Sequence, residues 1–490
     1  MTINEVFDEA DKAFKIYKKV SITKKVDFLG SIVDELEALG DELLKTAHDE
    51  SNLPISRLRG ERSRTINQLR LFSSMVKEGS WVEATIDTAL PDRKPLPRAD
   101  LRRMLLPLGP VVVFGASNFP FAFSTAGGDT ASALAAGCPV IYKEHPAHPK
   151  TSQMVFKAVL KALETCSLPL GIFQHVSGGI EIGQELVTHR SAKAVAFTGS
   201  YQAGKAIFDL ACQREQPIPV YAEMGSVNPI LVLHEKASKD PEQLAEIAAQ
   251  SVLLGAGQFC TCPGLIFYPE SDGLEGFIQK LAEKLREAPA EKMLHEGICN
   301  SYYSTLKQLL AEKGVEKLIL PDEDVLLGKA GLARTSLKEW LQNAALQEEI
   351  FGPFTLIVTY SSLTELERVA SILKGQLTCT IWGSEGDLDK AEGLIDVIKE
   401  RCGRLLFGGV PTGVEVSAAM THGGPFPTTT DSRSTSVGSY AIKRFARPFT
   451  YQSAPKALLP EELNDQNSLS IWRTVNNELT KESVFHIIEA

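Results

Sequence analysis

The sequence predicts an α/β protein with two parallel-sheet domains, a helical N-terminal region and a small β segment. Three observations lead to this prediction. The chain has 490 residues, and one domain usually takes about 100–200 residues. Short β-branched runs alternate with helical segments over 109–213, which is typical of right-handed βαβ units around a parallel sheet. A second alternation of the same kind follows residue 225 and continues to about residue 409.

The composition narrows the possible partners. Apolar residues make up 43% of the chain and charged residues 23%, which is ordinary for a soluble protein with large cores. The formal charge of −10 argues against nucleic acid or an anionic membrane, because either would favour a basic face. No window approaches the roughly 18–20 apolar residues of a membrane span, and the N-terminus lacks the apolar stretch of a signal peptide. We therefore expect a cytoplasmic protein with neither partner.

The eight cysteines are mostly scattered through apolar runs. This distribution suits buried thiols in a reducing cytosol better than a disulfide framework. A zinc site would require paired C-x₂-C motifs or a nearby histidine cluster, and the sequence has neither. We expect no metal.

The first domain is expected to contain the following elements in chain order. Residues 1–80 have helical spacing, and the segment 85–105, with several prolines and charges, should be an irregular excursion from the domain. Strands are expected at 109–116, 139–144, 171–178 and 194–199, and helices at 121–137, 150–164, 180–189 and 202–213.

The second domain follows the stretch "YAEMGSVNPILVL" (221–233). Its expected strands include "GLIFYPE", "FTLIVTY" and "LTCTIWG", and it ends near "GRLLFGG" (403–409). The tail from Ser439 should contain one strand-like stretch and then a polar helix or coil.

The stretch "GAGQFCTCPG" (255–264) holds Cys260 and Cys262 in a glycine-rich turn. Two buried structural thiols, a metal or redox pair, and one reactive nucleophile are the three alternatives. The C-x-C spacing closes a strained ring and has no partner ligands nearby, so the second alternative is the weakest. Glycines at such a turn let the backbone approach a ligand, and a thiol there can be reached by a substrate.

Two polar side chains follow other predicted strands. Asn118 lies in "FGASNFP" after one strand, and Glu223 lies in "AEMG" at the end of another. Alone, an asparagine is more often a turn residue and a glutamate is usually solvated. Together with Cys260 they form a set of nucleophile, oxyanion donor and base.

These stretches, taken in order, resemble motifs of the aldehyde dehydrogenase superfamily. The resemblance covers nearly the whole chain and rests on "SNFP", "FTGS", "AEMGSVNP", "GQFC" and "EEIFGP". It implies the family's fold, with a Rossmann-like cofactor domain, a second α/β catalytic domain and a small β oligomerisation flap. The corresponding segments here are 1–84 with 106–225, then 226–437, and finally 85–105 with 438–490. The resemblance also implies a homodimer or homotetramer.

The resemblance assigns roles residue by residue. Cys260 corresponds to the nucleophile, Asn118 to the oxyanion donor and Glu223 to the base that activates water; Cys262 lies at a variable position. The cofactor-binding residues that it implies are Lys143, Gly199, Ser200, Glu349 and Phe351. The reaction would be oxidation of an aldehyde to a carboxylate through a thiohemiacetal and a thioester, with NADP or NAD. Pro146 stands where NAD-preferring members carry a carboxylate, which favours NADP.

Three longer stretches, 51–72, 114–149 and 421–438, resemble the α-ketoglutaric semialdehyde (2,5-dioxovalerate) dehydrogenase branch. An acidic substrate would need a cationic or hydrogen-bonding anchor, for which Arg57, Arg433 and His422 are candidates, although each also has a structural explanation. A fatty or medium-chain aldehyde is the alternative substrate. A non-catalytic binding protein and a thiol esterase on the same fold are more remote alternatives.

Overall fold

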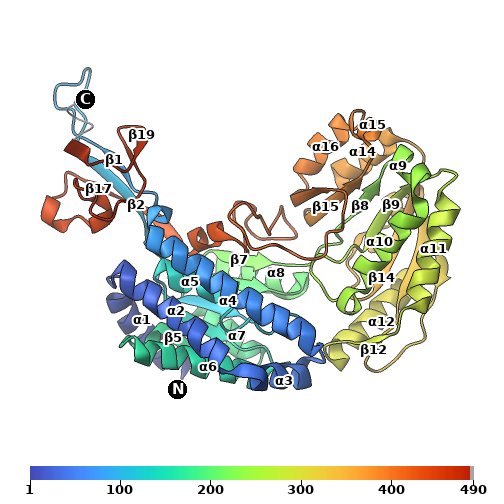
Figure 1. The fold of residues 1–490 in the computed structure, drawn as a ribbon, viewed down its shortest axis with the longest axis horizontal. Helices are drawn as coiled ribbons and strands as arrows, with labels where there is room; N and C mark the ends of the chain where they lie inside the picture. The colour runs from blue at the N-terminus through green and yellow to red at the C-terminus, as the bar shows by residue number, and fades with distance from the viewer. Residues whose placement is uncertain (486–490) are drawn as a thin grey trace.

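The computed structural model describes residues 1–485, which form two α/β bodies and a separate β arm (Figure 1). The first body runs from blue to pale green and the second from green to orange. The arm extends from the first body. The mixed α/β fold expected from the sequence is confirmed.

The first body is built on a five-stranded parallel sheet in the order β5-β4-β3-β6-β7. The chain enters this sheet at β3, adds β4 and β5 on one side, and then crosses to the other side to add β6 and β7. The sheet therefore has a topological switch point between β3 and β6. Its strands are β3 (Val111–Phe114), β4 (Val140–Lys143), β5 (Phe173–Val176), β6 (Ala194–Thr198) and β7 (Val220–Glu223). Its helices are α1 (Ile3–Tyr17), α2 (Ile22–Ala38), α3 (Gly40–Ser51), α4 (Ile55–Glu78), α5 (Gly128–Ala136), α6 (Pro149–Thr165), α7 (Ile180–Thr188) and α8 (Tyr201–Cys212).

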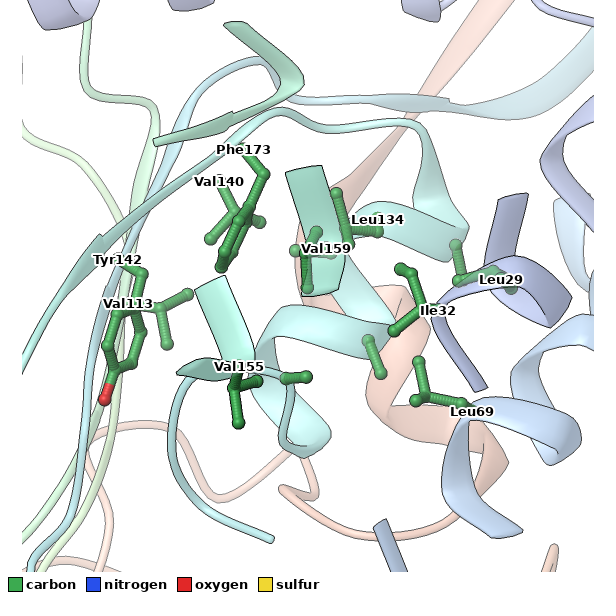
Figure 2. Packing of buried hydrophobic residues seen from close by; sticks show 14 of the residues in the cluster. Leu29, Ile32, Leu69, Val113, Leu134, Val140, Tyr142, Val155, Val159 and Phe173 are labelled. Carbon is green, nitrogen blue, oxygen red and sulfur yellow. The ribbon is translucent and has the colours of Figure 1, made fainter. Parts of the chain in front are cut away.

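Helices cover both faces of this sheet, which explains why its strands are almost entirely apolar. On one face, side chains of α2, α4, α5 and α6 pack on the sheet; Leu69, Leu134 and Val159 are among those in Figure 2. On the other face, α1, α7 and α8 pack against alternate strand residues such as Val112 and Ile141. The strands are therefore fixed from both sides, and their ends hold side chains at defined positions.

The second body contains a seven-stranded sheet in the order β11-β13-β14-β9-β8-β15-β16, parallel except for β11. Its strands are β8 (Ile230–Val232), β9 (Leu265–Pro269), β11 (Glu316–Ile319), β13 (Gly331–Ser336), β14 (Phe354–Tyr360), β15 (Gln376–Trp382) and β16 (Cys402–Phe407), and β10 (Glu291–Lys292) pairs with β12 (Leu327–Gly328) beside it. Its helices are α9 (His234–Lys239), α10 (Pro241–Leu253), α11 (Leu274–Glu287), α12 (Glu296–Ala311), α13 (Leu337–Gln342), α14 (Leu363–Ile372), α15 (Glu385–Leu388) and α16 (Glu392–Lys399).

The arm is a five-stranded sheet in the order β17-β2-β1-β18-β19. Its strands are β1 (Thr85–Asp87), β2 (Leu101–Pro107), β17 (Ala446–Gln452), β18 (Arg473–Val475) and β19 (Glu478–Thr480). A small apolar core that includes Ile86, Met104 and Val475 holds them together.

Three details differ from the sequence prediction. The segment 85–105, expected to be irregular, contains β1 and most of β2, which pair with each other in the arm. The helix expected at 121–137 begins only at Gly128, because residues 120–127 form tight turns in which Gly127 approaches the carbonyl of Ala122. The tail expected as helix or coil instead adds β18 and β19 to the arm, where β18 pairs with β1. The last five residues of that predicted segment, 486–490, lie outside the described residues.

Over residues 1–485, the helices are all too short or too polar to span a bilayer.

Candidate active site

The strands of the five-stranded sheet end together at one edge. Phe114 pairs with Lys143, and Thr198 pairs with Glu223, so the last residues of neighbouring strands lie in register. In open parallel sheets, ligands bind beyond this edge, close to the point where the strand order reverses. The residues that the sequence singled out at strand ends are therefore on the side of the sheet that can bind a ligand.

Cys260 lies in a tight turn between α10 and β9. Gly255, Ala256 and Gly257 all have positive φ values, of 58°, 54° and 66°. A Cβ atom at Gly257 would lie 2.2 Å from the carbonyl oxygen of Gly352, so only glycine fits there. This contact packs the segment 348–353 against the turn that presents the cysteine.

The structure brings Cys260 and Glu223 together around a third residue, His422. Nε2 of His422 lies 3.5 Å from Sγ of Cys260 and 2.9 Å from Oε1 of Glu223. The approach to Oε1 is not aligned as a hydrogen bond, and within the described chain this buried oxygen has no hydrogen-bond partner. The sulfur, the ring nitrogen and the carboxylate oxygen all lie within 4.8 Å of one another.

The loop 420–437 holds this trio in place. Ser436 donates its hydroxyl to Oε2 of Glu223 at 2.5 Å, and its hydroxyl also lies 3.2 Å from the carbonyl of His422. Thr435 accepts the backbone N–H of His422 at 2.8 Å. Glu223 and His422 are both buried, so their positions are set by packing as well as by hydrogen bonds.

The environment of the trio shifts its acid–base properties. Burial raises the pKa of Glu223, but the charge of the neighbouring His422 and hydrogen bonds, including that from Ser436, outweigh burial and lower the pKa below its ordinary value. Burial raises the pKa of Cys260 well above its ordinary value, and the negative charge of Glu223 raises it further. Glu223 is therefore ionised at neutral pH, while the Cys260 thiol needs a proton acceptor before it can react.

Asn118 lies against the cysteine turn. Its side-chain amide donates to the backbone carbonyl of Gln258 at 3.2 Å. Its backbone carbonyl accepts a hydrogen bond from Arg57 at 2.8 Å. Phe119 follows Asn118, and Phe259 lies between Gln258 and Cys260. Their rings pack edge to face, with the centroids 5.5 Å apart. The Asn118 amide is thus held against Gln258, two residues before the cysteine, with aromatic rings beside it.

Glu349 reaches the same region from the segment 348–353. A Cβ atom at Gly225 would lie 2.3 Å from Oε2 of Glu349, so this carboxylate closely approaches the backbone that follows Glu223. Burial raises the pKa of Glu349 to about 7. Phe351 is half-buried in the same segment, one residue before the contact of Gly352 with Gly257.

The predicted cofactor residues at the first sheet line a separate cavity of about 750 Å³ at the switch point. Lys143 ends β4 at its wall, and Ser200 caps the N-terminus of α8 there, with Gly199 just before it. The rest of the wall is largely apolar, including Phe114, Ile180 and Ala203. A cation at a strand end and a helix N-terminus over an apolar hollow fit a dinucleotide.

His422 is the residue whose position the sequence did not reveal. The sequence suggests it as an anchor for a substrate carboxylate, but in the structure it contacts the Cys260 thiol and the Glu223 carboxylate. The sequence analysis found no partner ligands near the C-x-C pair, but the fold brings His422, 162 positions along the chain, and Glu223 to Cys260. Arg433, another candidate anchor, points to solvent with 87% of its side chain exposed and pairs with Asp431.

The architecture, with two α/β bodies and a β arm, is that of solved dehydrogenases. Glyceraldehyde-3-phosphate dehydrogenase of Methanocaldococcus jannaschii, complexed with NADP, superposes with a TM-score of 0.77 at 20% identity and covers 92% of this chain and 93% of that one. Aldehyde dehydrogenase 21 of Physcomitrella patens, in complex with succinate, has a TM-score of 0.77 at 21% identity and covers 93% and 91%. At this level of identity, the superpositions establish that the chain shares the fold of these proteins.

Sequence comparison gives the family. The model of the aldehyde dehydrogenase family matches residues 1–322. Alpha-ketoglutaric semialdehyde dehydrogenase of Acinetobacter baylyi is 44% identical over 486 residues, which cover 98% of this chain and 92% of that protein. Alpha-ketoglutaric semialdehyde dehydrogenase 2 of Azospirillum brasilense is 46% identical over 467 residues, which cover 95% and 89%. The chain belongs to the aldehyde dehydrogenase family, and the resemblance identified from its motifs is confirmed.

Proposed function

We propose that this enzyme oxidises α-ketoglutaric semialdehyde to α-ketoglutarate through a covalent intermediate on Cys260. The observation that carries the chemistry is the contact of one ring nitrogen, Nε2 of His422, with both the Cys260 sulfur and the Glu223 carboxylate. The support for the substrate is the pair of relatives named for it, which are 44% and 46% identical over almost the whole chain.

The first step is activation of the thiol. Because the pKa of Cys260 is raised by burial, its proton must move to a neighbour before attack, and Nε2 of His422 is 3.5 Å away. The adjacent Glu223 carboxylate stabilises the imidazolium that forms. The thiolate then adds to the aldehyde carbon and forms a thiohemiacetal.

The oxyanion of this adduct would accept hydrogen bonds from the Asn118 amide and the backbone N–H of Cys260. Removal of one such donor typically costs about 3–4 kcal/mol. A bound dinucleotide would supply the hydride acceptor for this adduct, and Cys260 would then carry the thioester. Oε1 of Glu223, buried and without a hydrogen-bond partner in the described chain, is the oxygen that would take a proton from water for hydrolysis of the thioester.

For the cofactor we propose NADP or NAD in the cavity at the switch point. Lys143 would bind the ribose hydroxyls, and Gly199 and Ser200 the pyrophosphate, with Glu349 and Phe351 on the nicotinamide side. Pro146, which lines the cavity, offers no charge to repel a 2′-phosphate, and this favours NADP. The carboxylate of Glu144 lies 3.4 Å from His175, so part of its charge is directed away from the cavity.

The assembly and the roles of the segments belong to the same proposal. Segments 1–84 and 106–225 would bind the cofactor, 226–437 would carry the nucleophile, and 85–105 with 438–490 would join subunits into a homodimer or homotetramer. The arm's outer strand β19 leaves Leu479 exposed, which suits pairing with another subunit. The eight unpaired cysteines, all within the described chain, support a reducing compartment such as the cytoplasm.

A medium-chain aldehyde is the second candidate substrate. The aromatic rings of Phe119, Phe123 and Phe259 lie next to one another beside Asn118, and such rings suit an alkyl chain. A non-catalytic protein would explain neither the cofactor-sized cavity nor the carboxylate beside the thiol, and a thiol esterase would not explain the cavity.

The function is tested by steady-state kinetics with α-ketoglutaric semialdehyde and hexanal, each with NAD⁺ and NADP⁺, followed by absorbance of the reduced dinucleotide. EDTA belongs in the assay, because the Cys260, His422 and Glu223 donors could also bind an adventitious metal ion. We expect kcat/KM to be higher for the semialdehyde than for hexanal. A preference for hexanal would replace the proposed substrate, and ester hydrolysis without dinucleotide would replace the proposed reaction.

A further inference from the structure

Two arginines of α4, Arg57 and Arg64, lie two helical turns apart and face the same side of the helix. Each lies over a phenylalanine ring beside the thiol. Arg57 lies 4.6 Å from the ring centre of Phe259, and Arg64 lies 5.8 Å from that of Phe123. Helix α4 therefore brings two positive charges to the substrate side of the site.

Arg64 has one edge of its guanidinium without a partner. Nη1 donates to the carbonyl of Val414 at 2.7 Å, whereas Nε and Nη2 are buried and, over residues 1–485, make no hydrogen bond. Nε–H and Nη2–H form one side of the planar group, and that side matches the two oxygens of a carboxylate. Buried donors in native proteins are almost always satisfied, so this edge calls for a ligand.

Arg64 lies near the reacting sulfur, with Phe123 and His422 between them. The Phe123 ring beneath Arg64 lies 6.3 Å from the ring of His422, which contacts Cys260. The positive charge of Arg64 also lowers the pKa of Cys260 against the stronger effect of burial, so the two groups are within electrostatic reach. Arg64 is thus separated from the histidine that contacts the thiol by one aromatic ring.

Arg57 adds a second charge but is more fully engaged. Its Nη2 donates to the Asn118 carbonyl at 2.8 Å, and its Nη1 is buried without a partner in the described chain. Arg57 holds the loop of the oxyanion donor, and we regard it as a positioning residue.

Carboxylates such as Glu61 and Glu415 are near enough to raise the pKa of Arg64 against the larger opposite effect of burial, but none of them lies in direct contact with it in the described chain. Glu61 lies between the two arginines on α4, but its Oε1 accepts the backbone N–H groups of Phe121 and Ala122 at 2.8 and 2.9 Å. Neither guanidinium forms an ion pair within 4.0 Å in the part of the chain that the structure describes. Because a buried cation without a counterion is costly, an anionic ligand would stabilise this region.

We propose that the Nε/Nη2 edge of Arg64 binds the carboxylate at the far end of the substrate, with Phe119 and Phe123 excluding water around the intervening carbons. This inference rests on the proposed function and identifies the residue that would select a semialdehyde bearing a carboxylate over an alkanal. Sequence analysis suggested Arg57, Arg433 and His422 for this role and did not single out Arg64.

The test compares α-ketoglutaric semialdehyde with pentanal, which has the same number of carbons and no charge. Arg64→Met is expected to lower the ratio of the two kcat/KM values roughly 10- to 100-fold, mainly through KM for the semialdehyde. Arg64→Lys should give an intermediate ratio, because lysine keeps the charge but loses the two-pronged geometry. Arg59→Met is the matched control on the same helix, since Arg59 is 56% exposed and pairs with Asp41 across 3.5 Å.

An unchanged ratio in Arg64→Met would overturn the inference. Equal losses with both aldehydes would also overturn it, because they would place the effect of Arg64 on the thiol rather than on the substrate. If Arg64→Met does not fold, the ratio measured for Arg64→Lys decides in the same way.

Failure of the proposed function has a different signature. In that case the wild-type enzyme oxidises pentanal but not the semialdehyde, and glutarate becomes the probe. Glutarate that inhibits pentanal oxidation by the wild type, and inhibits Arg64→Lys at least tenfold more weakly, would keep the carboxylate subsite. Equal inhibition of the wild type and Arg64→Lys, or no inhibition of either, would contradict a carboxylate subsite at Arg64.

Discussion

Substitution of Cys260 by serine is expected to lower kcat by about a thousandfold or more, without loss of the fold. The serine hydroxyl is a far weaker nucleophile than a thiolate at neutral pH, and loss of a nucleophile typically removes most of the catalysis. The replacement is close in shape, and Cys260 is only half-buried, so the free energy of unfolding should change little. Reduced dinucleotide formed per enzyme, measured by stopped flow, gives the result directly.

Cys262→Ser is the matched control for this prediction. Cys262 lies in the same turn, but its sulfur is directed toward the Val252 carbonyl of α10, 3.9 Å away. Burial raises the pKa of its thiol to about 12, as it also raises that of Cys260, but the Val252 carbonyl cannot accept the thiol proton as His422 can. We expect Cys262→Ser to keep most of the activity. If instead Cys262→Ser is inactive and Cys260→Ser is active, the nucleophile has been assigned to the wrong sulfur.

The sequence predicted those parts of the fold in which local pattern and tertiary packing agree. The alternation of apolar runs and helices located β4 and α6 to within a residue or two of the structure, because a strand covered on both faces is apolar throughout. The strands β18 and β19 were missed, since each has three residues and exists only through pairing in the arm. A run that short carries no periodicity of its own.

The same distinction holds for the site. Cys260, Asn118 and Glu223 stand in motifs that can be recognised locally, and the structure brings the first and last within 4.8 Å. His422 and Arg64 stand in stretches whose residue types have ordinary structural explanations. Only the folded chain shows that one faces the thiol and that the other has an unpartnered edge.

Glu223→Gln is expected to separate the two halves of the reaction. Glutamine keeps the size of the side chain but cannot take a proton from water, and loss of a general base typically costs about 10²–10⁴-fold in rate. Thiol addition and hydride transfer do not require that proton transfer, so the first turnover should persist, although more slowly because glutamine no longer stabilises the imidazolium of His422. We expect a burst of reduced dinucleotide close to one per active site, followed by a steady-state rate at least a hundredfold below that of the wild type.

A wild-type steady-state rate in Glu223→Gln would exclude Glu223 as the base, and loss of the burst would place its role before acylation. The dependence on pH gives a second check. The pKa of Glu223 is lowered, so wild-type deacylation should decline only below the ordinary value of 4.5. His422→Asn removes the charge that lowers this pKa while burial remains, and the decline should therefore move to higher pH.

The same substitution reverses a contribution to stability. In the wild type, the depressed pKa of Glu223 stabilises the fold above the carboxyl's unfolded pKa, and this contribution is lost as the pH falls through the folded pKa. In His422→Asn, burial alone should raise the folded pKa above the unfolded one, so this carboxyl would stabilise at low pH and lose that effect as the pH rises. Urea unfolding of both proteins at pH 4 to 7 measures the difference. Parallel profiles would mean that His422 does not set the charge state of Glu223.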